Sequence, residues 1–337
     1  MARLGLSVTA DTLRLAQPFR IAGYLFETAD VLVVELSDGK CRGRGEAAGV
    51  YYTGDDLPHM RAAIEGAREA IEAGPSREEM RAILPPGGAR NAVDAALWDM
   101  EAQRAGRPVW QLAGLATPPR PIVTSFTVSA DTPDVMAATA RGYAAARSIK
   151  VKLTGELDLD LARVAAIRAA RPEVWLGVDG NQGFARGDLD ALVAGLSRHG
   201  VSLLEQPLAR GAEAELDGYV SPIPIAGDES LLSLADLSGA KGRFDVVNIK
   251  LDKCGGLTEG LIMAREARRL GLGVMVGTMI GTSLATAPGF ILGQLADLVD
   301  LDGPTFLATD RTPRVTYADG TLYAGPEIWG GGGRAAA

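Results

Sequence analysis

The chain has 337 residues, of which 23% are charged, and a formal net charge of −8 at pH 7. This length exceeds one ordinary domain and fits a barrel with a smaller second domain. The negative charge comes without basic clusters, which excludes nucleic acid as an expected partner because phosphate binding needs patches of Lys and Arg. Cys41 and Cys254 are far apart in the sequence, so we expect two isolated thiols in a reducing compartment.

The sequence predicts neither a membrane span nor an export signal. No stretch approaches the roughly 18 uninterrupted apolar residues that a span requires, and Asp11 and Arg14 soon follow the N-terminal segment. We therefore expect a cytoplasmic protein with no membrane partner. Residues 330–337 are rich in Gly and Ala and are predicted to form a disordered tail. The oligomeric state is left open, a homo-oligomer included.

Residues 1–120 have an α+β pattern. Two extended segments, 31–36 and 42–46, flank the turn at 37–40 and predict a β-hairpin. The spacing of apolar residues then predicts helices over 57–73, 76–84 and 89–106, the last of them ended by Gly106 and Pro108.

From about Pro121 the chain repeats a strand, a loop and a helix until about residue 312. The first strand of this repeat is predicted over Ile122–Val128, and the last approaches residues 298–302. We therefore predict a barrel domain at 121–312. A final extended segment near 315–322, within 313–329, is expected to return to the first domain and complete it.

Five short apolar runs in the barrel domain each end in a side chain that can bind a metal ion or transfer a proton: Lys152, Asp179, Glu205, Asp228 and Lys250. They follow one another at intervals of 22 to 27 residues, the length of one parallel α/β unit. If these units close into a barrel, all five side chains gather at its carboxyl-terminal mouth, where such folds carry their active sites. Three carboxylates flanked by two amines indicate a divalent-metal site with a base on each side.

Each of these residues also has a structural interpretation. Asp179 precedes Gly180 and could shape a turn, and Asp228 could cap a following helix. The metal site is favoured because three carboxylates on consecutive strand ends would otherwise need three independent coincidences. A lysine that closes an apolar inner strand is costly unless paired. His59 and His199 show no ligand pattern, so we predict no histidine base.

The order and spacing of six motifs resemble the enolase superfamily, in its muconate-lactonising subgroup, and within it the dipeptide epimerases. The resemblance covers nearly the whole chain and is closest to bacterial L-Ala-D/L-Glu epimerases, which share the segments at 83–85, 89–91 and 303–305. It implies a modified TIM barrel, (β/α)7β, with an N-terminal α+β capping domain. The motifs are Lys150–Lys152, Val178–Gln182, Glu205–Pro207, Gly227–Ser230, Asn248–Leu257 and Asp300–Pro304.

The resemblance also implies a cofactor, a substrate and a role for each residue. Mg²⁺ would be bound by Asp179, Glu205 and Asp228, and the substrate would be a small dipeptide epimerised at the α-carbon of its C-terminal residue. Lys152 and Lys250 would face opposite sides of that carbon and perform a 1,1-proton transfer through an enediolate. Lys150 would add electrostatic stabilisation.

Asp300 and Asp302 alternate along the last strand and can therefore converge on one ligand. The resemblance implies that they hold the free α-ammonium group of the dipeptide; two exposed aspartates at a strand end are the alternative. Thr127, at the end of the first barrel strand, occupies a position implied to contact the substrate.

The capping loop departs from the family pattern. In L-Ala-D/L-Glu epimerases it carries an arginine for the glutamate side chain, whereas residues 21–28 here contain none and Arg20 lies just before them. Tyr24, Phe26 and Glu27 are the predicted substrate contacts in this loop. They favour a hydrophobic or basic second residue over glutamate, with hydrophobic slightly preferred.

Two other functions remain open. The same lysines and metal could support a lyase or cycloisomerase of the muconate-lactonising or o-succinylbenzoate synthase type, against which the pair Asp300 and Asp302 argues. A non-catalytic metabolite-binding barrel is disfavoured because both lysines are retained.

Overall fold

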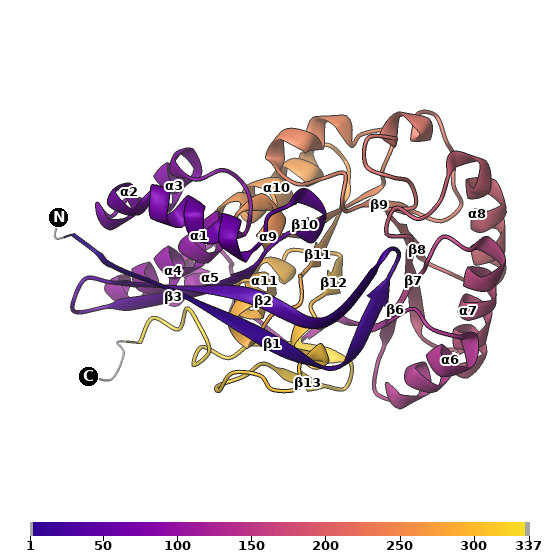
Figure 1. Ribbon diagram of the computed structural model, residues 1–337, viewed down its shortest axis with the longest axis horizontal. Coiled ribbons are helices and arrows are strands. Elements are labelled where there is room, and N and C mark those ends of the chain that lie inside the picture. Colours follow the sequence, from indigo (N-terminus) through magenta and orange to yellow (C-terminus); the bar gives the residue numbers. More distant parts are fainter. Residues whose placement is uncertain (1–2, 334–337) are drawn as a thin grey trace.

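The computed structural model describes residues 3–333. Its N-terminal part contains an antiparallel sheet in the order β1-β2-β3. Its strands are β1 (Gly5–Ile21), β2 (Tyr24–Ser37) and β3 (Arg42–Ala48). The β2–β3 hairpin predicted from the sequence is confirmed. In its turn the Asp38 carboxylate accepts hydrogen bonds from the backbone N–H groups of Lys40 and Cys41. The long β1–β2 hairpin extends from this sheet across the barrel (Figure 1).

Helices cover one side of this sheet: α1 (Leu57–Gly66), α2 (Arg68–Glu72), α3 (Arg77–Ile83), α4 (Gly88–Ala105) and α5 (Val109–Leu112). The helix predicted over 57–73 is divided at Ala67, which leaves helical geometry (φ −100°, ψ 4°). The helix α3 begins at a capping box formed by Ser76 and Glu79. The helix α4 ends at Gly106 in the left-handed conformation, as its sequence predicted.

The helix α4 packs directly against β3 because two strand residues are glycines. A Cβ atom on Gly43 would lie 1.9 Å from the Ala96 carbonyl oxygen, and one on Gly45 would lie 2.1 Å from the Ala92 carbonyl oxygen. No other residue type permits this approach of helix and strand.

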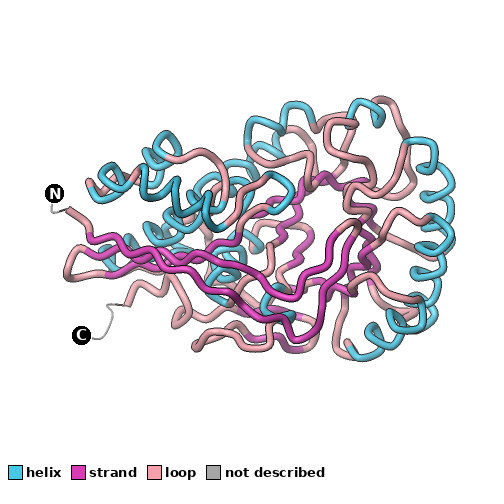
Figure 2. Tube along the Cα trace, in the orientation of Figure 1, coloured by secondary structure: helices cyan, strands magenta, loops and turns pink. Residues whose placement is uncertain are grey.

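Eight parallel strands form the second sheet, in the order β12-β11-β10-β9-β8-β7-β6-β5. It is a nearly closed barrel whose strands lie inside a ring of helices (Figure 2). The strands are β5 (Ser125–Val128), β6 (Ser148–Lys152), β7 (Trp175–Asp179), β8 (Leu203–Glu205), β9 (Ile225–Gly227), β10 (Val246–Lys250), β11 (Gly273–Gly277) and β12 (Leu298–Asp300). The predicted fold class, a modified TIM barrel with an α+β capping domain, is confirmed.

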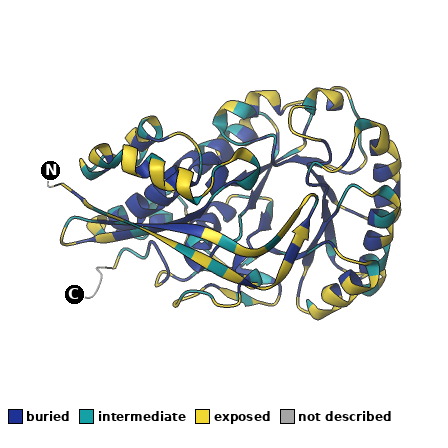
Figure 3. Cartoon of the chain, in the orientation of Figure 1, coloured by how far each residue is buried: buried dark blue, intermediate teal, exposed yellow. Residues whose placement is uncertain are grey.

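The connections between strands include α6 (Pro133–Gly142), α7 (Leu157–Ala170), α8 (Leu189–Arg198), α9 (Leu251–Cys254), α10 (Leu257–Arg269) and α11 (Ser283–Gly293). Short 3₁₀ helices, η3 (Glu213–Leu216) and η4 (Leu234–Gly239), follow β8 and β9. The barrel strands are buried, and the outward faces of the surrounding helices are exposed (Figure 3). No helix within residues 3–333 has the length and apolar character to cross a membrane.

The first barrel strand is shorter than the predicted Ile122–Val128. Residues Ile122–Val123 form β4, which pairs with β14 (Thr321–Tyr323) in a small sheet, and only β5 joins the barrel. Side-chain hydrogen bonds close the barrel between β5 and the end of β12. Thr124, between β4 and β5, accepts at Oγ1 from Leu301 N at 2.9 Å, and Thr127 N of β5 donates to Asp302 Oδ2 at 2.6 Å.

The C-terminal segment also differs from its prediction. The stretch near 315–322 pairs β13 (Thr316–Ala318) with β14 beside β4, and contacts with the capping domain come before and after it. Before it, Arg311 pairs with Asp11 and Glu46. After it, Trp329 Nε1 donates to the carbonyl oxygens of Arg44 and Ala95, and Gly330 N donates to Asp99 Oδ1 at 2.9 Å. Gly330, the first residue of the predicted disordered tail, is therefore fixed to the capping domain, and residues 334–337 of that tail lie outside the described part of the chain.

We expect Gly43→Ala to lower the free energy of unfolding by about 1–3 kcal/mol, because the added methyl group overpacks the contact between β3 and α4. Denaturant unfolding measures this change. Gly66→Ala is the control, since a Cβ atom there meets nothing within 4 Å. Equal stabilities of the two variants would contradict the assigned contact.

Candidate active site

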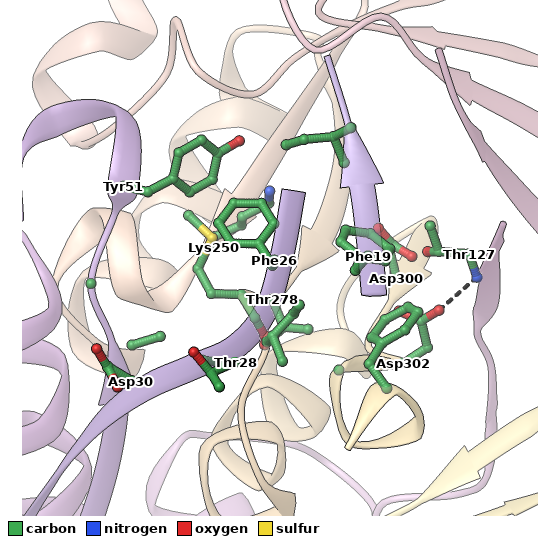
Figure 4. Close-up of a pocket in the computed structure, with 18 of the residues that line it drawn as sticks. Phe19, Phe26, Thr28, Asp30, Tyr51, Thr127, Lys250, Thr278, Asp300 and Asp302 are labelled. Carbon is green, nitrogen blue, oxygen red and sulfur yellow. Dashed lines mark hydrogen bonds between the residues drawn. The ribbon is translucent and has the colours of Figure 1, made fainter. Parts of the chain in front are cut away.

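A cavity of about 300 Å³ lies between the β1–β2 hairpin and the carboxyl ends of the barrel strands. Its barrel side contains Lys150, Lys152, Lys250, Asp300 and Asp302. Its capping side contains apolar and aromatic groups, including Phe19, Ile21, Phe26 and Tyr51. Tyr51 and Phe26 lie beside Lys250, while Thr127 and Asp302 lie at the other side of the cavity (Figure 4).

The lysines at the base of this cavity are surrounded by carboxylates. Lys150 Nζ lies 3.2 Å from Asp179 Oδ2, 2.8 Å from Glu205 Oε2 and 2.8 Å from Asp300 Oδ2. Burial disfavours its charged form, but the carboxylates outweigh burial and raise the pKa of Lys150 well above its ordinary value. Lys150 is therefore a fixed positive charge.

Lys152 and Lys250 approach the carboxylates from opposite sides of the barrel. They end β6 and β10, four places apart in the order of eight strands. Lys152 Nζ lies 2.7 Å from Asp179 Oδ2, and Lys250 Nζ lies 2.7 Å from Asp228 Oδ2. Burial would lower the pKa of Lys250, but Asp228 raises it above the ordinary value, the direction opposite to that needed for a base near neutral pH.

Asp179, Glu205 and Asp228 form a compact oxygen cluster at the ends of β7, β8 and β9. One ligand oxygen from each lies within 4.8 Å of the others, and all three residues are at most 1% exposed. Glu205 Oε2 and Asp228 Oδ2 are buried, and their partners are the ammonium groups of Lys150 and Lys250 at 2.8 and 2.7 Å. Three buried carboxylates that converge in this way offer the hard oxygen ligands that fit a divalent cation.

The balance of charged groups in the site also supports the binding of a divalent cation. The ammonium groups of four lysines, at 150, 152, 250 and 253, face the six buried carboxyl groups of Asp179, Glu205, Asp228, Glu229, Asp300 and Asp302. Burial and, after it, the Asp179 carboxylate raise the pKa of Glu205 to about 7, and burial and Asp228 raise the pKa of Glu229 to about 8. With all six carboxyl groups ionised the site would carry two excess negative charges, which a divalent cation would balance.

Two polar residues that support the triad were not predicted from the sequence. Lys253 Nζ donates to Asp228 Oδ1 at 2.5 Å, to the Asp228 carbonyl oxygen and to the Asn248 carbonyl oxygen. Asn248 Nδ2 donates to Glu205 Oε1 at 2.7 Å. The period of two along β10 signals that Asn248 shares a face with Lys250; no comparable signal marks Lys253, because its reach depends on the turn into α9.

Asp300 and Asp302 both face the cavity, but each is already engaged. Asp300 Oδ2 pairs with Lys150, and Asp302 Oδ2 accepts from Thr127 N. Asp300 Oδ1 is buried without a hydrogen bond. Burial and the neighbouring Asp300 raise the pKa of Asp302 to about 7. The pair is therefore a buried acidic site with one open oxygen beside the base of the cavity.

The capping loop contributes less to the cavity than its sequence suggested. Phe26 lines the cavity, with Thr28 and Asp30 following at alternate positions of β2. Glu27 is exposed and absent from the lining, because alternation along the strand turns it away. Tyr24 is 45% exposed and contacts Tyr51, with ring centroids 4.6 Å apart.

Tyr51 was missed by the sequence analysis. It lies after β3, far from the capping loop in sequence, and its ring centroid is 5.3 Å from that of Phe26. The described residues that line the cavity include no arginine, and Arg20 is exposed outside it. The capping side of the cavity thus combines the aromatic rings of Phe26 and Tyr51 with the acidic side chains of Asp30, Asp55 and Asp56.

Comparison with known proteins agrees with this architecture. Residues 3–114 match the N-terminal domain of the mandelate racemase / muconate lactonizing enzyme family, and residues 135–327 match the enolase C-terminal domain-like family. The L-Ala-D/L-Glu epimerase of Escherichia coli K12 is 40% identical over 311 residues, which cover 92% of this chain and 96% of that protein.

Two solved structures extend the comparison. An enolase family member from Agrobacterium tumefaciens, with homology to dipeptide epimerases and with sodium and L-Ala-L-Glu bound, has a TM-score of 0.92 at 39% identity and covers 97% of this chain and 100% of its own. A dipeptide epimerase from Methylococcus capsulatus, complexed with Mg and L-Arg-D-Lys, has a TM-score of 0.89 at 30% identity, with coverage of 96% and 97%.

The chain therefore belongs to the mandelate racemase and muconate lactonizing enzyme family of the enolase superfamily. Within that family it is an isomerase of the racemase and epimerase class.

We expect Asp179→Asn, Glu205→Gln and Asp228→Asn each to weaken the binding of a divalent cation at least tenfold, because each removes one anionic ligand. Isothermal titration with Mg²⁺ measures the affinity without reference to catalysis. Asp94→Asn, which alters a buried carboxylate outside the cavity, is the control. Unchanged affinity in the three triad variants would contradict the assigned ligands.

Proposed function

We propose that this protein is a Mg²⁺-dependent epimerase of dipeptides that inverts the α-carbon of the C-terminal residue. The observation that carries the proposal is the placement of Lys152 and Lys250 on opposite strands around the triad, in one cavity with Asp300 and Asp302. Two bases that face one carbon from opposite sides can invert it, whereas one base can only exchange its proton. The dipeptide epimerases among the relatives support the substrate class.

Asp179, Glu205 and Asp228 would hold the Mg²⁺ ion. The ion supplies positive charge that stabilises the substrate carboxylate as the α-proton leaves, and that lowers the pKa of the neighbouring lysines. Lys150, held among three carboxylates, adds a permanent positive charge at the same place.

Lys152 and Lys250 carry out the proton transfer. The neutral amine of one lysine takes the α-proton on its own face of the carbon, while the ammonium group of the other returns a proton from the opposite face. After one turnover the two lysines have exchanged protonation states, so the reverse reaction follows the same path. Water is excluded by the capping hairpin, whose Phe19, Ile21 and Phe26 cover the cavity.

Asp300 and Asp302 would recognise the free amino terminus. The open Oδ1 atom of Asp300 accepts a hydrogen bond from the ammonium group, and the negative charge of the pair favours a cation in a site without water. Thr127 contributes by holding Asp302 through its backbone N–H group. A lyase of this family has no use for an ammonium site, so this acidic pair favours the epimerase.

The aromatic wall of the cavity would receive the side chain of the epimerised residue. Phe26 and Tyr51 offer apolar surface, and no arginine lines the cavity within residues 3–333 to pair with a glutamate carboxylate. Hydrophobic second residues are therefore the proposed substrates. Glu27 is exposed outside the lining and offers no partner to a basic side chain, so such a partner would come from Asp30, Asp55 or Asp56.

We expect Lys152→Ala and Lys250→Ala both to abolish epimerisation, while each variant still exchanges the α-proton of one stereoisomer with solvent. The remaining lysine still reaches its own face of the carbon. Deuterium incorporation into L-Ala-L-Phe and L-Ala-D-Phe, followed by NMR in D₂O, separates the two faces. Identical exchange patterns in the two variants would rule out opposed bases.

We expect acetylation of the amino terminus of a good dipeptide substrate to lower kcat/KM at least a hundredfold, because it removes the charge that Asp300 and Asp302 recognise. Asp302→Asn should lower kcat/KM for the free dipeptide and have a smaller effect on the acetylated one. Equal turnover of the free and acetylated substrates would favour racemisation of N-acylated amino acids instead.

We expect L-Ala-L-Phe and L-Ala-L-Leu to exceed L-Ala-L-Glu in kcat/KM, with steady-state kinetics on a matched L-Ala-L-Xaa series as the measurement. Phe26→Arg should raise the relative kcat/KM for L-Ala-L-Glu by about tenfold or more, since it introduces a bidentate partner into the cavity wall. Leu25→Arg, at an exposed position outside the lining, is the control. A wild-type preference for L-Ala-L-Glu would contradict the assigned pocket.

A further inference from the structure

The two proposed bases are connected to the rest of the molecule in different ways. Lys152 ends β6, and the next segment is fixed within the barrel, where the backbone N–H groups of Thr154 and Gly155 donate to the Asp160 carboxylate of α7. Within the described residues 3–333, no hydrogen bond joins residues 153–156 to the capping domain. Lys250 ends β10 and leads directly into α9, one turn of helix without a side-chain cap.

The capping domain holds α9 through buried hydrogen bonds from α4. Asn91 Nδ2 donates to Asp252 Oδ1 at 3.0 Å, and Arg90 Nε donates to the Gly255 carbonyl oxygen at 3.2 Å. Asn91 and Asp252 are 3% and 4% exposed. A buried amide and carboxylate that satisfy one another fix their relative position, because any separation leaves both polar groups unpaired.

Asp252 also joins α9 to the walls of the active-site cavity. Its Oδ1 atom accepts from Ala48 N at 3.1 Å. Ala48 lines the cavity. One carboxylate, two residues after Lys250, therefore connects α9 to β3 and α4.

We propose that Asn91 and Asp252 are positioning residues for Lys250. The capping domain then orients the side chain of Lys250, whereas contacts within the barrel alone orient that of Lys152. This inference rests on the proposed function. Loosening the contact between Asn91 and Asp252 slows proton transfer at the face of the α-carbon that Lys250 serves. Transfer at the face served by Lys152 continues. Lys253 belongs to the same turn and holds Asp228 of the triad, so the Mg²⁺ affinity of the variant is measured as well and should stay near the wild-type value if only Lys250 is displaced.

The test compares α-proton exchange of the two stereoisomers in the Asn91→Ala variant. The rates of deuterium incorporation into L-Ala-L-Phe and L-Ala-D-Phe are measured by NMR in D₂O with saturating Mg²⁺, and the Lys152→Ala and Lys250→Ala variants identify the isomer that each lysine serves. We expect exchange of the Lys250 isomer to fall about tenfold to a hundredfold, the usual effect of a small misplacement of a catalytic group. Exchange of the other isomer should change less than about threefold.

A conservative variant at the other residue of the pair provides a second readout. Asp252→Asn keeps an Oδ1 acceptor for both Asn91 Nδ2 and Ala48 N, so the ratio of the two exchange rates should stay near the wild-type value, whereas Asp252→Ala removes that acceptor and should lower the ratio as Asn91→Ala does. Asp94→Asn is the matched control. Asp94 lies one turn further along α4 and bonds Thr258 N and Oγ1 of α10, so its loss weakens the same interface beyond α9 and leaves the ratio unchanged.

Equal slowing of both isomers in Asn91→Ala, or a ratio in Asp252→Asn as low as that in Asp252→Ala, would overturn the inference. If Asn91→Ala is not obtained folded, Asn91→Ser, which shortens the side chain and removes the same donor geometry, is judged by the same ratio. Failure of the proposed function looks different: the wild-type protein would then exchange neither isomer of any dipeptide, whereas failure of this inference leaves wild-type exchange intact.

Discussion

The constraint on which the site depends is a concentration of negative charge that the barrel buries at the carboxyl ends of its strands. Parallel strands bring their last residues to one edge, so Asp179, Glu205 and Asp228 meet although they are distant in the sequence. Carboxylates taken out of water at this spacing are stable only when opposite charge lies between them. The lysines supply part of that charge, and a divalent cation bound by the triad would complete it.

Several features of the molecule follow from this requirement. Lys150 and Lys253 are saturated by carboxylate and carbonyl oxygens and serve as fixed charges. Lys152 and Lys250 each pair with a single carboxylate and line the cavity. The two lysines proposed as bases thus have fewer oxygen partners than Lys150 and Lys253. The capping hairpin adds an apolar cover that keeps these interactions strong.

Much of this arrangement could be predicted from the sequence. Each residue of the central cluster ends an apolar run, and the regular interval between runs predicts parallel strands and a shared edge, which the structure shows. The break between β4 and β5 was not predicted, since the whole stretch has strand-like composition and only pairing with the distant β14 divides it. The outward orientation of Glu27 depends on the register of β2, which the composition of the loop does not reveal.

The sequence pattern also did not predict the contacts between distant segments. Tyr51 reaches the cavity from the segment after β3, and Asn91 reaches Asp252 across the domain interface. Neither residue is marked by periodicity or by a charge pattern, because such contacts arise only when the capping domain docks on the barrel. Two sets of roles remain predictions that rest on side-chain chemistry. Lys152 and Lys250 are predicted to be the bases, and Asp300 and Asp302 to bind the ammonium group.

The central claim is that two opposed lysines invert the α-carbon of a free dipeptide. Incubation of the wild-type protein and Mg²⁺ with pools of L,L-dipeptides in D₂O, followed by mass spectrometry and chiral analysis of the products, tests it most directly. The account predicts a gain of one mass unit at the C-terminal residue together with appearance of the L,D-isomer, strongest for hydrophobic second residues. Deuterium in no free dipeptide, or loss of mass through elimination of water, would contradict it.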